Sequence, residues 1–128
     1  MTYVLNLSHV SVQRGDTQIL SDVSWSTRPR QHWVIVGPNG AGKTTLARVA
    51  SGRIAPDSGD VTVSETDLAQ ADPAEVATRV GLASAAVGAK IVPTPSVLDT
   101  VRSAAWGLAV AHDEEYEPMD GEGARALL

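Results

Sequence analysis

The sequence predicts an α/β fold in which a small antiparallel β-sheet is followed by part of a parallel sheet with helices. Short segments in which apolar and polar residues alternate fill the chain from Tyr3 to Val36. A glycine-rich loop then joins an apolar segment to an amphipathic helix, and later apolar segments of strand length alternate with helix start signals. With 128 residues the chain has the size of one domain.

The first part of the chain is predicted to form short antiparallel strands. The alternation of residues 3–7 resumes at residues 10–12 after a slip of phase, which indicates a strand that contains a bulge. Two further short strands are expected at residues 18–20 and 23–27, separated by a break. Residues 32–36 then form the apolar strand that precedes the glycine loop.

Helix signals follow the glycine loop. A helix that begins near Lys43 is expected to end before Gly52, because glycine is the preferred residue just after a helix. Asp72 and Pro73 have the residue types of an N-cap and a first helical position. The remaining elements expected from the pattern are strands at residues 60–64 and 80–84 and a helix over residues 96–106.

The composition excludes several classes of protein. Residues 113–122 contain six carboxylates and no cation, and together with Arg125 they account for the net charge of −5, so no basic face is available for nucleic acid. No apolar run reaches the length of about 18 residues that spans a bilayer. Because the chain also lacks cysteine and a recognisable signal peptide, we expect it to be cytoplasmic.

Residues 37–44, GPNGAGKT, have the spacing of a phosphate-binding loop. Glycines let the backbone approach an anion closely, so that successive amides point at phosphate oxygens, and the following helix adds its positive end. Lys43 is expected to contact the β and γ phosphates, Thr44 to ligate Mg²⁺ and Thr45 to bond the α phosphate. The expected phosphate-binding residues are Gly37, Pro38, Asn39, Gly40, Ala41, Gly42, Lys43, Thr44 and Thr45.

The amino-acid sequence around this loop is similar to that of an ATP-binding cassette (ABC) nucleotide-binding domain. The loop GPNGAGKTTL is preceded by ILSDVSWS and followed by VASGRIAPDSGDVTV, and the likeness extends over residues 3–106. The resemblance implies a P-loop NTPase of the ABC type, with a small antiparallel subdomain beside a mostly parallel sheet. Residues 1–128 would then be the N-terminal part of one such domain, without its signature and acidic-strand half.

The resemblance also implies a function. In the family, ATP and Mg²⁺ are bound, Lys43 would be the catalytic residue of this chain, and hydrolysis drives transport through membrane-embedded subunits. A second cassette protomer would complete the site as a dimer, and the protein would be peripheral at the inner face of the cell membrane. Two alternatives remain open, a nucleotide-binding regulatory cassette that does not hydrolyse ATP and a small P-loop kinase.

Some positions depart from the family pattern. The aromatic residue that stacks on adenine is replaced by Arg14, whose guanidinium plane can also stack on a base. The family glutamine after the strand at residues 80–84 is replaced by Ala85, which offers no oxygen, and Ser84 is the nearest polar substitute. No LSGGQ-like signature and no strand ending in Asp-Glu occur in these 128 residues, so we expect the chain alone to be inactive.

Overall fold

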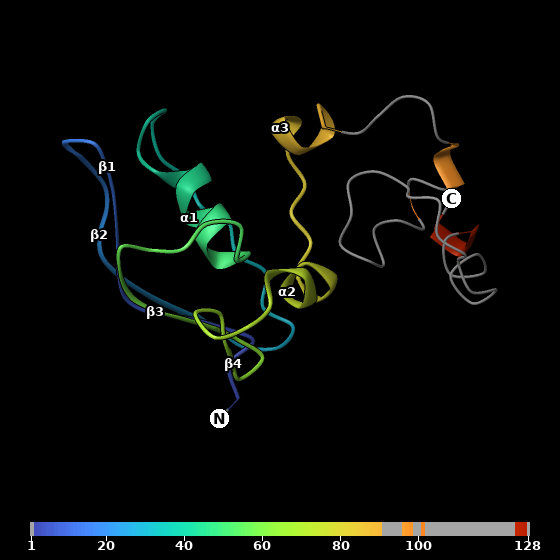
Figure 1. The fold of residues 1–128 in the computed structure, drawn as a ribbon, viewed down its shortest axis with the longest axis horizontal. Coiled ribbons are helices and arrows are strands. Elements are labelled where there is room, and N and C mark those ends of the chain that lie inside the picture. The colour runs from blue at the N-terminus through green and yellow to red at the C-terminus, as the bar shows by residue number, and fades with distance from the viewer. Residues whose placement is uncertain (1, 91–95, 99–100, 102–124, 128) are drawn as a thin grey trace. The chain divides into compact units, whose positions relative to one another are not determined.

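The computed structural model describes residues 2–90, 96–98, 101 and 125–127, which form two compact units (Figure 1). The first unit is Met1–Pro73 and the second is Ala74–Leu128, and each is described by itself. None of the helices within the described ranges combines the length and the apolar character needed to cross a membrane.

The first unit is built on a four-stranded antiparallel sheet. Its strands are β1 (Leu5–Arg14), β2 (Thr17–Thr27), β3 (Ser58–Val63) and β4 (Thr66–Asp67). They lie in the order β2-β1-β3-β4, so that β1 pairs with β2 on one side and with β3 on the other. The predicted antiparallel meander is therefore completed by β3, which comes after the glycine loop.

A bulge corrects the side-chain phase of β1. Leu7, Val10 and Val12 are all buried, although the first two are separated by three positions and would face opposite sides of a regular strand. The register with β2 shifts between Leu7 and Val10, and His9 adopts a φ of 53°. The predicted bulge is confirmed, and its effect is to turn both apolar residues to one face.

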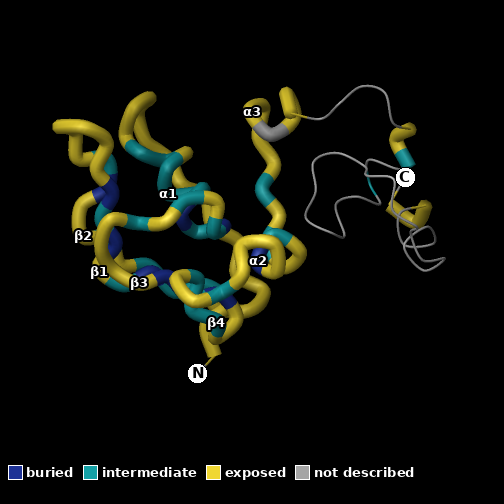
Figure 2. The backbone as a smooth tube through the Cα atoms, viewed as in Figure 1, coloured by how far each residue is buried: buried dark blue, intermediate teal, exposed yellow. Residues whose placement is uncertain are grey.

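Helix α1 (Lys43–Ala50) covers the apolar face of the sheet. Val49 is fully buried against residues of the three long strands, as the dark-blue segments in Figure 2 illustrate. The helix ends as the sequence predicts, because Gly52 has a φ of 71° and its amide bonds to the Val49 carbonyl. The Arg53 amide bonds to the Arg48 carbonyl, which completes a Schellman motif.

Two expectations about strands in the first unit are wrong. β2 is continuous, because the break expected near Asp22 is a second bulge at which that residue adopts a φ of 50°. Residues 32–36 belong to no strand of the described part of the chain, and Val34 and Val36 are 83% and 85% exposed. A parallel strand obtains its hydrogen bonds from segments distant in sequence, and no segment that the structure describes pairs with these residues.

The second unit has short helices in its described part. Helix α2 (Pro73–Arg79) begins where the sequence predicts, and Glu75 pairs with Arg79 one turn later. Helix α3 (Ala85–Gly88) follows residues 80–84, which are not in a strand, so that expectation is also wrong. The expected helix over residues 96–106 lies mostly outside the described residues.

Candidate functional site

The phosphate loop, residues 37–44, curls back on itself before α1. The Ala41 amide bonds to the Pro38 carbonyl at 3.2 Å, which closes a turn through Asn39 and Gly40. Gly40 and Gly42 have φ values of 82° and 97°, in the left-handed region that other residues rarely adopt. Gly42 of the sequence motif, and Gly40 between the two motif glycines, are thus required by the backbone path of the loop.

Lys43 is directed into this turn. Its Nζ donates to the Gly37 carbonyl at 2.7 Å and to the Pro38 carbonyl at 2.6 Å. An ammonium group has three donors, so these two bonds hold the charge beside the loop and leave one donor for another oxygen. This arrangement places a half-buried positive charge where the chain reverses.

Thr44 and Thr45 lie in the first turn of α1, with Thr44 exposed and Thr45 half-buried. The first amides of any helix have no carbonyl partner within that helix, and here no side chain caps them. Gly42 is the N-cap residue, and no acidic residue lies in the first turn. The helix therefore presents free amides and its positive end to the phosphate loop, and its first turn carries the hydroxyls of Thr44 and Thr45.

The β1–β2 hairpin contacts the end of the phosphate loop. A methyl group built on Gly42 would lie 2.9 Å from the Ile19 carbonyl oxygen and 3.1 Å from Leu20 Cδ2. The space beside the Gly42 Cα is therefore filled by β2. The sequence carries no motif that would reveal this contact, because it joins two segments separated by more than twenty positions.

Arg14 lies on the same hairpin. It is exposed at the end of β1, opposite Thr17 in the register, and the turn between them contains Gly15 with a φ of 56°. The turn and the phosphate loop lie toward the same end of the first unit in Figure 1. Arg14 is thus connected to the loop through β2, whose residue Ile19 touches Gly42.

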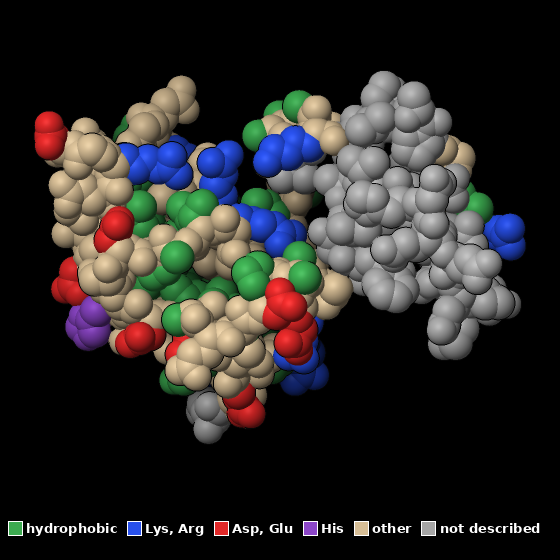
Figure 3. Space-filling model, viewed as in Figure 1, with side chains coloured by type: hydrophobic (Ala, Val, Ile, Leu, Met, Phe, Trp, Pro, Cys, Tyr) green, Lys and Arg blue, Asp and Glu red, His purple; other side chains and the backbone are tan. Residues whose placement is uncertain are grey.

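Charge is distributed unevenly on the first unit. On the face shown in Figure 3, Lys and Arg side chains lie beside α1, whereas Asp and Glu side chains are spread over the sheet. This arrangement suits an anionic ligand near the start of the helix.

Ser84 and Ala85 are both exposed and belong to the second unit, with Ala85 as the first residue of α3.

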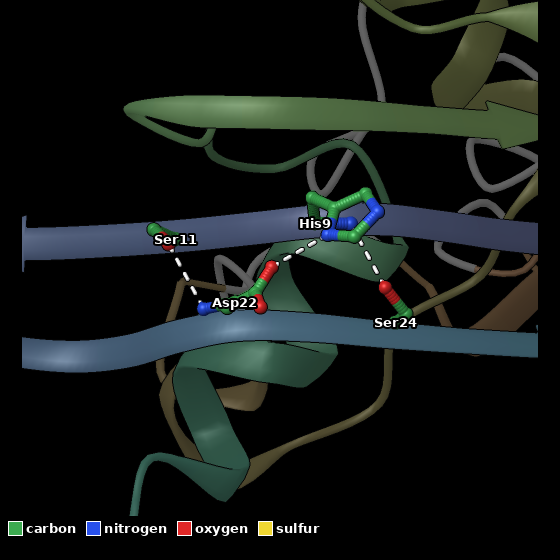
Figure 4. Close-up of polar contacts among 4 residues, drawn as sticks. All are labelled: His9, Ser11, Asp22 and Ser24. Atoms are coloured by element: carbon green, nitrogen blue, oxygen red, sulfur yellow. Dashed lines mark hydrogen bonds and ion pairs between the residues drawn. The ribbon is translucent and has the colours of Figure 1, made fainter.

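A cluster of polar side chains on β1 and β2 lies outside the phosphate loop, and its hydrogen bonds indicate a structural role. His9 Nδ1 is 2.7 Å from Asp22 Oδ1, while the backbone amides of these two residues bond to the hydroxyls of Ser24 and Ser11 (Figure 4). Ser24 bonds to the main chain of His9 and not to its ring, so the group is not arranged as a nucleophilic triad. Within the described ranges, no cluster of three or more potential ligand side chains could hold a metal ion.

Comparison with known proteins shows which family this chain resembles. The model of the family described as "ABC transporter" matches residues 20–122. The hemin import ATP-binding protein HmuV of Thermobifida fusca is 45% identical over 78 residues, which are 61% of this chain and 28% of that protein. The uncharacterized ABC transporter ATP-binding protein YlmA of Bacillus subtilis is 34% identical over 104 residues, 80% of this chain and 39% of that protein.

Solved structures of cassettes have the same fold. A dimeric ATP-binding cassette in a post-hydrolysis state with ADP and Pi superposes with a TM-score of 0.73 at 17% identity, covering 95% of this chain and 54% of that one. A nucleotide-free ATP-binding cassette superposes with a TM-score of 0.62 at 24% identity, and the match covers 98% of this chain and 53% of that one. The chain thus spans about half or less of the length of the proteins it matches.

Proposed function

The chain belongs to the ABC transporter family, and from this premise we propose that its phosphate loop binds the triphosphate of ATP. The observation that carries the proposal is the Lys43 ammonium, which lies against the Gly37 and Pro38 carbonyls at the start of α1. A cation, free helix amides and a glycine turn together provide the donors that a triphosphate needs. ADP and Pi occupy the related dimeric cassette, in agreement with this choice of ligand.

Each residue of the loop has a distinct role in the proposed site. Lys43 would donate its remaining N–H to oxygens of the β and γ phosphates, and Thr45 would donate to the α phosphate. The amides at the start of α1 would hold the negative charge that develops on the transferring phosphoryl group. Lys43 is therefore the proposed catalytic residue, and the other proposed binding residues are Gly37, Pro38, Asn39, Gly40, Ala41, Gly42, Thr44 and Thr45.

Mg²⁺ fits the exposed hydroxyl of Thr44, the second residue of α1. A magnesium ion bound there would neutralise phosphate charge, and hydroxyl and phosphate oxygens are ligands that it accepts. We further propose that the site works beside a second cassette and membrane-embedded subunits at the inner face of the cell membrane. The dimeric cassette structures and the transporter names of the relatives support these partners.

A second candidate is a cassette that binds ATP without hydrolysing it. Ala85 stands where the family carries glutamine and begins the short helix α3, so its side chain supplies no oxygen to a metal ion or to water. Ser84, the nearest polar side chain, precedes that helix. Binding would then regulate conformation, and Lys43 would still be required.

Replacement of Lys43 tests the proposed binding. Lys43→Ala removes the charge at the loop, so the variant should lose most of its affinity for Mg·ATP in isothermal titration calorimetry, about tenfold or more. Lys90→Ala is the matched control, because it removes the other lysine of the chain, which is exposed and lies outside the loop. Equal affinities for the wild type and both variants would show that the loop is not the ATP site.

A further inference from the structure

The segment that leads into the phosphate loop, residues 32–36, is here called the entry arm. We propose that Trp33 is a positioning residue, whose ring contact with Trp25 holds the entry arm against the antiparallel sheet and so fixes the loop carbonyls that hold Lys43. This inference rests on the proposed function, because it concerns the geometry of the same phosphate loop. Its consequence is that phosphate binding, with or without a nucleoside, depends on a pair of indole rings outside the loop.

The phosphate loop is held differently on its two sides. On the exit side, α1 is fixed to the sheet through Val49, which is fully buried in the core. On the entry side, no strand pairs with residues 32–36 and no backbone hydrogen bond joins them to another segment within the described part of the chain. Val34 and Val36 are largely exposed. Side-chain contacts therefore have to hold the entry arm.

The contact that joins the entry arm to the sheet is a pair of indole rings. The ring centroids of Trp25 and Trp33 are 5.7 Å apart and the ring planes make an angle of 77°, which is the edge-to-face geometry that aromatic pairs favour. Trp25 is itself held in place, because it pairs with Leu7 of β1 and packs against the buried core. Its Nε1 is buried without a hydrogen-bond partner among the described residues. The ring of Trp25 is therefore held by packing, and Trp33 packs against it.

A closed turn brings Trp33 back to Trp25. The Gln31 amide bonds to the Arg28 carbonyl at 3.3 Å, and the Arg28 amide bonds to Oε1 of the Gln31 side chain at 2.7 Å. Arg30 in this turn has a φ of 65°, in the left-handed region that tight turns often use. The chain thus reverses directly after β2, and the entry arm is fixed at the turn and at the indole pair.

The entry arm ends at a residue that contacts Lys43. Trp33 lies four positions before Gly37, whose carbonyl accepts a hydrogen bond from Lys43 Nζ at 2.7 Å. A methyl group built on Gly37 would lie 3.5 Å from Ala41 Cβ and 3.9 Å from Lys43 Cδ, so the loop closes around this residue. A shift of the entry arm therefore moves an oxygen that holds the ammonium group. Since Lys43 contacts the phosphates in the proposed site, a loose arm weakens every ligand that places phosphates there.

The experiment measures binding of inorganic tripolyphosphate and of ATP to the 128-residue chain by calorimetry, together with urea unfolding of each variant. Trp33→Ala removes the ring and should weaken both ligands by the same factor, about threefold or more. Trp33→Leu keeps an apolar side chain without a ring and should show the same loss, and it decides the question if the alanine variant does not fold. Trp33→Phe keeps a ring and should bind as the wild type does.

Variants at two other positions complete the design. Val34→Ala is the matched control, because Val34 lies in the same arm with an exposed side chain, and it should leave both affinities unchanged. Trp25→Phe keeps a ring and removes the unpaired Nε1, so it should also retain binding, whereas Trp25→Leu should weaken it. Because Trp25→Leu and Trp33→Ala break the same contact, the double variant should bind no more weakly than the weaker single variant.

The outcomes separate this inference from the proposed function. If the Trp33 variants lower the urea midpoint but leave both affinities unchanged, the ring contact is structural only and the inference is wrong. It is also wrong if Trp33→Phe binds as weakly as Trp33→Ala, if Val34→Ala causes the same loss, or if ATP binding alone is weakened. The proposed function survives all these results as long as wild-type binding depends on Lys43. If the wild type binds neither ligand, the proposed function and this inference are both wrong.

Discussion

At the scale of single residues, Lys43 shows how the loop is prepared for an anion. A lysine side chain is flexible, and ordering it costs up to about 2 kcal/mol of conformational entropy. Here its Nζ is already held by the Gly37 and Pro38 carbonyls, so part of that cost is met during folding and not during binding. The ammonium also satisfies carbonyls that the tight turn would otherwise leave to water.

Arg14 is the second residue whose role is open to test. We predict that Arg14→Ala weakens ATP binding by about 0.5 to 2 kcal/mol, the usual range for stacking of a cation on an aromatic ring. Arg14→Tyr should preserve or tighten binding, because a phenol ring also stacks on adenine. Titration with ATP measures both effects, and Arg28→Ala is the control, since Arg28 is exposed and lies outside the hairpin turn. Identical affinities for all the proteins would exclude a contact of Arg14 with the base.

At the scale of the elements, two bulges lie opposite each other in β1 and β2. His9 and Asp22 both have positive φ values, and each offers its backbone amide to a serine hydroxyl on the opposite strand. Their side chains are 75% and 73% exposed, so the ion pair between them contributes little to stability. The value of the arrangement is that both strands change phase together, which keeps the apolar residues of each on the face covered by α1.

The bulge in β1 packs closely against Gly59 of β3, and this contact predicts the effect of replacing that glycine by alanine. A methyl group built on Gly59 would collide with the His9 carbonyl oxygen, and Gly59 has a φ of 87°. Gly59→Ala should therefore lower the free energy of unfolding by roughly 2 to 4 kcal/mol, from left-handed strain and overpacking together. Gly15→Ala is the matched comparison, because Gly15 also has a positive φ but its methyl group would meet open space. Urea unfolding should show a clearly smaller loss for Gly15→Ala, and equal losses would mean that the contact with His9 is unimportant.

The elements that the sequence predicts correctly are those that local chemistry determines. The β1 bulge follows from the apolar pattern around His9, and the end of α1 follows from Gly52. The start of α2 follows from Pro73, whose missing amide suits a first helical position. In each case the necessary information lies within one turn or a few strand positions.

The predictions that are wrong depend on distant partners. Residues 32–36 are apolar on both faces, as expected for a buried parallel strand, but their pairing would have to come from other segments. Ile35 and Trp33 are 44% and 54% exposed, and the rings of Trp33 and Trp25 pack edge to face at a centroid distance of 5.7 Å. The contact of Ile19 with Gly42 is equally non-local, which is why the motif alone predicts the loop and not its support.

At the scale of the whole molecule, the chain corresponds to about half of a cassette. The matched structures are covered to 54% and 53% of their length, while this chain is covered almost completely. The described residues therefore contain the phosphate loop together with the antiparallel sheet that supports it.

This division predicts that the 128-residue chain binds Mg·ATP weakly and does not hydrolyse it at a measurable rate. The phosphate loop supplies contacts to the ground state, whereas a water-orienting carboxylate, the family glutamine and a partner's signature loop act mainly in the transition state. Loss of one such electrostatic group costs about 3 to 4 kcal/mol in activation free energy, so loss of several should leave turnover at background. Colorimetric phosphate release from the purified chain, compared with Lys43→Ala, measures this directly. Turnover that depends on Lys43 would contradict the prediction, and Asp113 and Glu114, which lie outside the described residues, would then be the first carboxylates to replace.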